Sequence, residues 1–332
     1  MTRRMKNVYK LTIVLVACVG ARAQDTVTNS YLQTNLVTDI AGKAPKTDPH
    51  LVNPWGLSRG ANTDWWVADA GTGVSTLYDG SGDISTLVVK IPPASGTGAG
   101  SPTGTVAFGS GFVFVTLDGT ISEWTSGTTA VIKVNNSSKG AVYTGCTLAS
   151  NNGVTTLYVA NAAGSVEAYT TSFTPVTLTQ GAFVDPNVPA GYTPYGIQNA
   201  GGKIWVTFTA GVGTGLGYVD AFSPAGTLVL SLQHGSWMNE PWGIALAPAN
   251  FGLFSKMLLV GNTGSGTIGA FNPSTGTFEG FLKNSAGKAI ADPGLWAIYF
   301  GSGGVSGPAT TLYFTAGIDN YLKGLFGSIT AN

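Results

Sequence analysis

Two acidic residues, Glu240 and Asp292, have the type and the placement that chemistry would require. Glu240 comes directly before a Pro-Trp-Gly tripeptide, Asn53 comes directly before another, and Asp292 lies four residues before Trp296. Carboxylate and amide oxygens are the ligands that a hard cation such as Ca²⁺ prefers. Glu240, Asp292 and Asn53 are therefore a candidate metal site, provided that the fold brings them together.

A cation at such a site could act as a Lewis acid on an ester or lactone carbonyl. Glu240 and Asp292 would then be catalytic residues of a metal-dependent hydrolase, with Asp69 orienting the attacking water. A simpler interpretation competes with this one, because Asp and Asn beside Gly also form turns through hydrogen bonds to their own backbone. The sequence contains no G-x-S-x-G motif, Cys/His cluster or EF-hand loop that would point to another chemistry.

The tripeptide Pro-Trp-Gly is one step of an internal repeat. A glycine followed five residues later by an aromatic residue, or once by Ile, recurs at 73–78, 119–124, 164–169, 217–222, 266–271 and 324–329. Two apolar runs rich in β-branched and aromatic residues precede each of these segments, and in several units a more variable fourth run follows. Four short strands in a unit of about 50 residues are typical of one blade of a β-propeller. The sequence therefore predicts an all-β, six-bladed propeller with four-stranded blades.

The last repeat ends after its third strand, and the segment LQTNLVTDI (32–40) before the first repeat alternates like a strand. We expect this segment to supply the missing strand and close the ring, because an open array would leave exposed edges. Residues 24–52 would then be the closing strand and lead-in, and 53–332 the remainder of one propeller domain. Trp55, Trp242 and Trp296 fall on equivalent inner strands, where packing between blades is the expected role.

One end of the propeller is predicted to collect the polar residues. Consecutive strands of a blade are antiparallel, so the start of strand one and the end of strand two lie at the same end. An inner ring near the channel mouth and an outer ring from the strand-two hairpins follow from this geometry. Together with two tryptophans, they supply the predicted binding residues: Asn53, Trp55, Asp69, Asn161, Thr193, Glu240, Trp242, Asn262 and Asp292.

The first 23 residues have the pattern of a secretory signal peptide. Four basic residues come before an apolar stretch at 11–20, and Ala-Arg-Ala at 21–23 suits cleavage before Gln24. The run at 15–18 also resembles a lipobox, which would place a lipid on Cys18. We therefore expect an exported protein, secreted or periplasmic, with anchoring at Cys18 as the alternative. No other apolar run is long enough to cross a membrane.

Removal of the signal peptide leaves 11 basic and 16 acidic residues, a net charge of about −5. This charge disfavours nucleic acid and anionic membranes as partners. Cys146 would be the remaining cysteine, so no disulfide can form within the chain, and its place on an inner strand predicts a buried thiol. We expect a monomer.

The stretch NPWGLSRGANTDWWVADAGTGVSTLYDGSG (53–82) resembles the NHL-type propeller repeat, in which Asn-Pro-x-Gly leads into an apolar strand ending in Val-Ala-Asp. Ordered motifs over residues 31–329, among them LDGTISEW, EPWGIALAPANFG and GTIGAFNPSTG, resemble a family of exported, mostly bacterial six-bladed propellers with no established activity. The resemblance implies the fold and export. The similarity to gluconolactonase-type propellers, which are calcium-dependent lactonases, is architectural only.

Charged residues make up only 10% of the chain, which favours binding over catalysis. The leading hypothesis is an exported binding or scaffold module whose polar end engages a small molecule, a glycan or a protein. The alternative is the metal-dependent lactonase or esterase described above, with Ca²⁺ as its cofactor. Whether the protein is an enzyme stays open at this point, with the sequence favouring one that is not.

Overall fold

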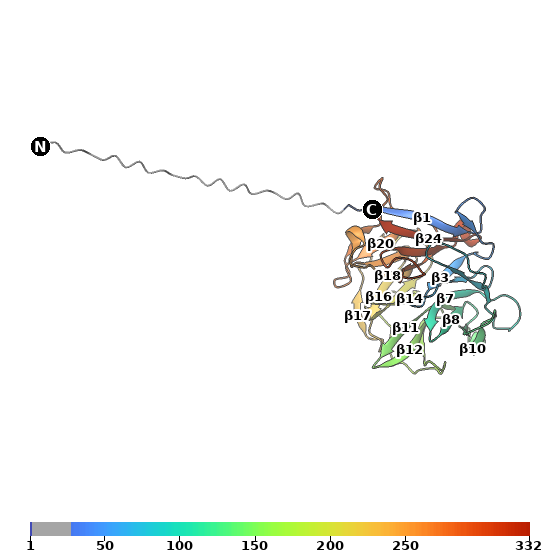
Figure 1. The fold of residues 1–332 in the computed structure, drawn as a ribbon. Coiled ribbons are helices and arrows are strands. Elements are labelled where there is room, and N and C mark those ends of the chain that lie inside the picture. Colours follow the sequence, from blue (N-terminus) through green and yellow to red (C-terminus); the bar gives the residue numbers. More distant parts are fainter. Residues whose placement is uncertain (2–27) are drawn as a thin grey trace.

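The computed structural model describes Met1 and residues 28–332. The predicted signal peptide and Cys18 lie outside these residues, apart from Met1. Six β-sheets surround a central axis, as Figure 1 shows. The innermost strands contact one another in the closed order β3, β7, β11, β14, β18, β22 and back to β3. The predicted six-bladed, all-β propeller is confirmed.

The blades follow one another along the chain. Blades one to three contain β3 (Pro54–Ser58), β4 (Trp65–Asp69), β5 (Val74–Tyr78), β6 (Val89–Lys90); β7 (Pro102–Phe108), β8 (Gly111–Thr116), β9 (Thr120–Trp124), β10 (Val131–Asn135); and β11 (Tyr143–Asn151), β12 (Val154–Asn161), β13 (Ser165–Tyr169). Blades four to six contain β14 (Thr193–Ala200), β15 (Lys203–Thr209), β16 (Tyr218–Phe222), β17 (Leu228–Ser231); β18 (Pro241–Leu246), β19 (Leu258–Asn262), β20 (Ile268–Phe271), β21 (Phe278–Phe281); and β22 (Leu295–Phe300), β23 (Leu312–Ala316), β24 (Leu325–Ala331), β1 (Tyr31–Thr38).

The N-terminal strand closes the ring, as the sequence predicts. β1 pairs antiparallel with β24 and gives blade six its fourth strand, so the first and the last strand of the chain lie side by side in one blade (Figure 1). The two-residue strand β2 (Lys46–Thr47) adds to β1 in parallel. Blade three departs from the prediction, because an isolated bridge between Tyr169 and Pro175 stands in place of a fourth strand. Proline has no N–H to donate to a ladder, which limits pairing there.

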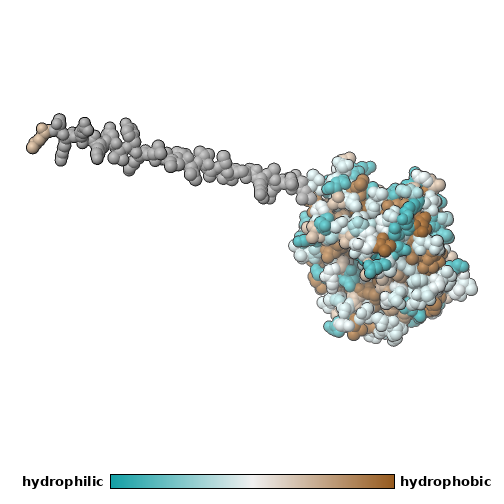
Figure 2. Space-filling model, in the orientation of Figure 1, coloured by the Kyte–Doolittle hydropathy of each residue, from teal (hydrophilic) through white to brown (hydrophobic). Residues whose placement is uncertain are grey.

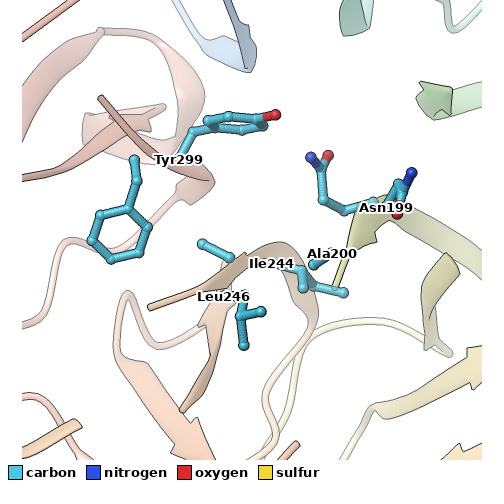
Figure 3. A pocket seen from close by; sticks show the side chains of 8 residues that line it. Asn199, Ala200, Ile244, Leu246 and Tyr299 are labelled. Atoms are coloured by element: carbon cyan, nitrogen blue, oxygen red, sulfur yellow. The ribbon is translucent and has the colours of Figure 1, made fainter. Parts of the chain in front are cut away.

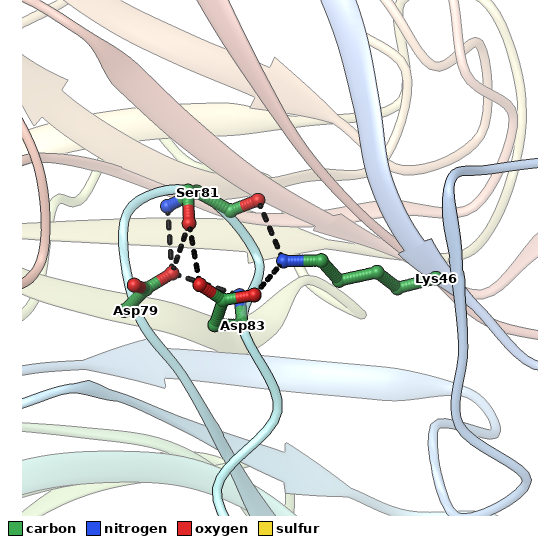
Figure 4. Close-up of polar contacts among 4 residues, drawn as sticks. All are labelled: Lys46, Asp79, Ser81 and Asp83. Carbon is green, nitrogen blue, oxygen red and sulfur yellow. Dashed lines mark hydrogen bonds and ion pairs between the residues drawn. The ribbon is translucent and has the colours of Figure 1, made fainter.

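A lysine attaches the lead-in segment to blade one (Figure 4). Asp79 accepts hydrogen bonds from the backbone N–H and the hydroxyl of Ser81, both at 2.8 Å. Lys46 pairs with Asp83 across this turn and reaches the carbonyl of Ser81 at 3.5 Å. The ammonium thus neutralises part of an exposed acidic turn and ties β2 to the neighbouring blade.

Glycine allows the inner strands to approach the axis closely. A Cβ built on Gly196 would lie 2.1 Å from the carbonyl oxygen of Trp242, and one on Gly243 would lie 2.4 Å from that of Trp296. Both are the third residue of a Pro-x-Gly step in the repeat. The repeated glycine therefore reflects packing between blades, where a side chain has no room.

The helical elements of residues 28–332 are single turns: the 3₁₀ turns η1 (Ser137–Lys139) and η2 (Gly252–Phe254), and α1 (Ile318–Tyr321), whose backbone is left-handed at Asp319 and Asn320. Among residues 28–332, no helix has the length and apolar character needed to span a membrane. Cys146 lies on β11, an inner strand, and is buried with a free thiol, as predicted. The visible surface of the propeller carries hydrophobic and hydrophilic residues interspersed, without one continuous apolar band (Figure 2).

Candidate functional site

The predicted polar rings lie at the end of the propeller where the inner strands begin, which we call the top face. Pro54 at the start of β3 pairs with Asp69 at the end of β4, and Pro241 at the start of β18 pairs with Asn262 at the end of β19. The antiparallel pairing brings the start of the first strand and the end of the second to one end of each blade.

The outer-ring residues Asp69, Asn161 and Asn262 hold their own loops. The carboxylate of Asp69 accepts hydrogen bonds from the N–H and the hydroxyl of Thr76, at 3.0 and 2.8 Å. The amide oxygens of Asn161 and Asn262 accept backbone N–H groups of Val142 and Asn239, both at 2.9 Å. All three outer-ring side chains are buried, and burial raises the pKa of Asp69 well above its usual range. These hydrogen bonds stay within one blade and connect the end of its second strand to its third strand or to a residue before its first strand.

The two candidate metal ligands have different partners. Glu240 accepts a hydrogen bond from the hydroxyl of Tyr195 at 3.3 Å. Asp292 accepts one from Gln33 of β1, on the outer side of blade six, at 3.1 Å. Within residues 28–332, no three His, Cys, Asp or Glu side chains are grouped so that they could hold a metal ion. Thr193, the remaining inner-ring candidate, is half-buried at the start of β14.

Aromatic rings from four blades meet over the axis. Trp55 and Trp296 stack with ring centroids 3.6 Å apart. Trp242 meets both edge-on, at 6.3 and 6.0 Å. Tyr195 of blade four contacts Trp55 at 6.0 Å and Trp296 at 5.9 Å. The packing between blades expected of these tryptophans is present. Trp296 contacts the tryptophans of both neighbouring blades, and the contact of Trp55 with Trp242 joins blades one and five, which are not neighbours in the ring.

Hydrogen bonds fix two of the three indoles. Trp296 donates its N–H to the side-chain oxygen of Asn53 at 3.0 Å, and Trp242 donates to the carbonyl of Thr144 in blade three at 2.9 Å. The indole N–H of Trp55 is buried and has no partner among the described residues. Asn53 thus acts as an acceptor for a buried tryptophan, a role that the metal hypothesis did not include.

Residues with left-handed backbone are concentrated on the rim of the top face, where the inner strands begin. Asn53 has φ 46° and Glu240 has φ 56°, each directly before the proline that begins an inner strand, and Gly294 before β22 has φ 85°. Residues 319–321, in the connection from β23 to β24, have φ values of 52°, 55° and 66°. Such a conformation costs a residue other than glycine about 1–2 kcal/mol, and strained backbone is concentrated at functional sites. Five of the nine non-glycine residues with positive φ lie on this rim.

A hollow of about 570 Å³ opens on the top face between blades four, five and six. It is lined by Val212, Thr263, Gly264, Pro293, Gly294, Gly317, Ile318, Asp319, Asn320 and Tyr321. The ring of Tyr321 lies 5.6 Å from that of Trp296, so the aromatic cluster continues into the wall of the hollow. A Cβ built on Gly317 would lie within 3.1 Å of atoms of Asn53, Tyr321 and Trp296, which shows how closely these residues converge.

Two buried oxygens beside the hollow lack partners. Thr263 lines the hollow, is fully buried, and its hydroxyl has no hydrogen-bond partner in the described chain. The second carboxylate oxygen of Glu240 is also buried without a partner. The two residues adjoin, because the N–H of Thr263 donates to the carbonyl of Glu240 at 2.9 Å. Unpaired buried polar atoms are uncommon in native proteins and call for an explanation.

Burial and the charge of Glu240 together change the pKa values of the ionisable groups around this residue. Burial raises the pKa of Glu240, with the hydrogen bond from Tyr195 acting in the opposite direction. Burial, and then the charge of Glu240, raises the pKa of Tyr195 well above its usual range and that of Tyr321 less strongly. The site therefore combines neutral phenols with one poorly solvated carboxyl group.

A second, smaller hollow lies at the opposite end of the channel. A hollow of about 170 Å³ lies where the inner strands of blades four to six end, lined by Gln198, Asn199, Ala200, Ile244, Ala245, Leu246, Tyr299 and Phe300 (Figure 3). The side-chain amide of Asn199 already donates to the carbonyl of Leu148 at 2.9 Å. This smaller hollow has fewer unmet polar groups to offer a ligand.

Sequence reasoning missed three residues of the top-face site: Tyr195, Thr263 and Tyr321. Tyr195 could have been found, because it takes the place of tryptophan in the Pro-x-Gly step of the fourth repeat. Thr263 and Tyr321 carry no signal, since their roles depend on contacts between blades.

Comparison with known proteins gives relatives without a stated function. No family model matches the chain. The uncharacterised protein R648 of Acanthamoeba polyphaga mimivirus is 28% identical over 327 residues, covering 89% of this chain and 78% of the relative. The uncharacterised protein L690 of the same virus is 28% identical, covering 86% and 82%. R640, also from this virus, is 30% identical over 203 residues, which cover 56% of this chain and 37% of the relative.

Solved structures with this fold include enzymes. A streptogramin B lyase superposes with a TM-score of 0.56 at 16% identity, covering 91% of this chain and 97% of the other. A catalytically inactive virginiamycin B lyase from Staphylococcus aureus, solved with quinupristin, gives 0.54 at 14% identity, covering 91% and 99%. A luciferin-regenerating enzyme gives 0.57 at 12% identity, covering 85% and 92%. At these identities the likeness shows the fold alone.

Proposed function

We propose that the protein is a binding module that holds a small organic molecule in the top-face hollow. The observation that carries this proposal is the hydroxyl of Thr263, a residue that lines the hollow and is fully buried, because this hydroxyl has no hydrogen-bond partner in the described chain. A ligand that supplies a partner to this hydroxyl would remove the free-energy cost of leaving it unpaired, about 1–3 kcal/mol.

The shape and lining of the site support this function. A volume of about 570 Å³ falls within the range of small-molecule sites, which combine apolar and aromatic walls with a few polar groups. Tyr321 provides an aromatic wall, and the left-handed turn at 319–321 holds it against Trp296. The virginiamycin B lyase solved with quinupristin is a propeller of similar fold with an organic ligand.

The residues do not favour the alternative of a metal-dependent hydrolase. Glu240 and Asp292 contact different neutral partners, and the carboxylate of Asp69 is bound within its own hairpin. Export of the chain, free or anchored at Cys18, stays part of the proposal and rests on the pattern of residues 1–23.

A ligand screen followed by fluorescence titration tests the proposal. Trp296 contacts Tyr321 in the wall of the hollow, so a molecule that binds there and raises the melting temperature should also change tryptophan emission. We expect Tyr321→Ala and Thr263→Val to weaken that binding at least tenfold. Lys256→Ala is the matched control, because Lys256 also has positive φ (62°) but does not line the hollow. Hits that bind both variants as tightly as the parent would place the binding site elsewhere.

A further inference from the structure

Two overlapping glycosylation sequons lie together in blade two. An Asn-x-Ser/Thr sequence in which x is not proline is the acceptor for N-linked glycans in exported proteins. Asn135 is followed at this spacing by Ser137, and Asn136 by Ser138. The chain has no other sequence of this kind without proline at the middle position. The motif alone does not decide which of the two asparagines is the acceptor.

Asn135 has the exposure and the hydrogen bonds of an acceptor. It is exposed at the end of β10, the outermost strand of blade two. Its amide oxygen accepts hydrogen bonds from the N–H of Ser137 at 3.1 Å and from the hydroxyl of Ser137 at 2.7 Å. This turn places the hydroxyl of the third sequon residue against the amide of the first. The amide nitrogen donates one N–H to the carbonyl of Ala94 at 2.9 Å, which leaves the second N–H for a sugar to replace.

Asn136, in contrast, uses both of its amide N–H groups within the fold. They donate to the hydroxyl of Tyr143 at 2.7 Å and to that of Tyr169 at 2.9 Å. Both tyrosines are buried, and both donate in turn to the carboxylate of Glu167. A sugar on this nitrogen would replace one N–H and push the buried phenols apart. The network of hydrogen bonds is therefore incompatible with a glycan at Asn136.

We infer that Asn135 is an N-glycosylation site and that Asn136 is not. In the reaction, the amide nitrogen of Asn135 attacks the anomeric carbon of an oligosaccharide that is carried on a lipid pyrophosphate. A carbon–nitrogen bond forms, and the carbon–oxygen bond to the pyrophosphate breaks. The lipid pyrophosphate leaves with the electron pair, and the amide proton passes to a base of the transferase. This inference rests on the proposed export of the chain and not on a ligand in the top-face hollow.

The fold selects between the two sequons after the sugar is attached, because the transferase acts on the chain before blade two has folded. A glycosylated Asn135 keeps its amide oxygen for Ser137 and one N–H for Ala94, so β10 and its turn can still form. A chain glycosylated at Asn136 cannot form the network with the buried tyrosines. The folded protein should therefore carry its glycan at Asn135. Blade two does not line the top-face hollow, so the glycan would leave that site open.

Expression of the full chain, with its own N-terminus, in a eukaryotic secretory cell line tests the inference. We expect the folded protein from the medium and from the membrane-enclosed compartments to lose mass on treatment with peptide-N-glycosidase. This enzyme converts a glycosylated Asn to Asp. Fragmentation of the peptide that contains residues 135–138 in a mass spectrometer should place the new Asp at position 135.

The two neighbouring serines provide a matched pair of variants. Ser137→Ala removes the sequon of Asn135 and leaves that of Asn136, and should lower the glycosylated fraction of the folded protein at least tenfold. Ser138→Ala removes the sequon of Asn136 and leaves that of Asn135, and should change this fraction less than twofold. Both serines are exposed, so melting temperatures within a few degrees of the parent would show that both variants fold.

The opposite results would overturn the inference. A glycan that is kept in Ser137→Ala and lost in Ser138→Ala would assign the modification to Asn136. A parent chain without a glycan, whether it enters the secretory pathway or stays in the cytosol, would show that Asn135 is not modified. Neither result bears on the top-face hollow, because the ligand screen decides the binding module by itself.

Discussion

The inner and outer rings of the top face contain the same residue types but are stabilised differently. In the outer ring, one oxygen of Asp69 and the amide oxygen of Asn262 accept hydrogen bonds from residues of their own blades, while the other oxygen of Asp69 is buried and unpaired. In the inner ring, Asn53 and Glu240 have left-handed backbone and contact aromatic residues of other blades. Identical polar side chains on one face thus have a structural role in one ring and a candidate binding role in the other.

The outer ring should be the more sensitive to truncation. We expect Asp69→Ala to lower the free energy of unfolding by about 3 kcal/mol, because it leaves the N–H and hydroxyl of Thr76 buried without an acceptor. Urea denaturation measures this loss. Asp69→Asn, which keeps an acceptor oxygen, should lose less than half as much. An equal loss in both variants would mean that the charge, and not the hydrogen bonds, is what stabilises this turn.

In the inner ring, removal of a charged group should instead increase the stability of the fold. We expect Glu240→Gln to raise the free energy of unfolding by about 1 kcal/mol at pH 8, because ionising a buried carboxyl with one unpaired oxygen is costly. The pKa of Glu240 is raised in the folded state, so its neutral form is favoured there. Its contribution to stability is therefore greatest at acid pH and is lost as pH rises through the raised pKa.

Denaturation curves measured over a series of pH values test this predicted pH dependence of stability. The stability difference between Glu240→Gln and the parent should narrow from pH 8 toward pH 4, where Glu240 is protonated in both folded and unfolded chains. A difference that does not change with pH would show that the effect is one of packing.

The contrast between the rings also shows what sequence could and could not predict. The six blades and the closing strand β1 follow from repeated runs of β-forming residues and from a last repeat that lacks one strand. The top-face position of Asn53 and Glu240 follows from strand direction alone. Their distinct roles do not, because the stacking of Trp55 on Trp296 depends on how closely six inner strands approach the axis. The turn that presents Tyr321 has three consecutive left-handed residues. Asp319 and Asn320 are residue types that adopt this conformation singly, but their sequence does not predict three such residues in succession.

A glycine substitution in the turn at 319–321 tests whether its left-handed backbone contributes to ligand binding. We expect Asn320→Gly to stabilise the fold by about 0.5 kcal/mol, since glycine adopts positive φ without a steric penalty and loses part of this gain to its greater freedom in the unfolded chain. Thermal denaturation with and without a bound ligand from the screen measures both consequences. If the strain serves binding, the gain in stability should come with weaker binding, as the turn holds Tyr321 less firmly.

The smallest expected effect is that of divalent metal. Ca²⁺ usually takes six to eight oxygen ligands, whereas Glu240 accepts a hydrogen bond from Tyr195 and Asp292 accepts one from Gln33 on the outer side of blade six. We therefore expect 5 mM Ca²⁺ or EDTA to change the melting temperature by less than about 1 °C, the scale below which a stability change is negligible for a chain of this size. A cation bound by the folded state alone at 100 times its dissociation constant would stabilise the fold by about 2.7 kcal/mol. A rise of several degrees that disappears in Glu240→Gln would return the carboxylate to the role of a metal ligand.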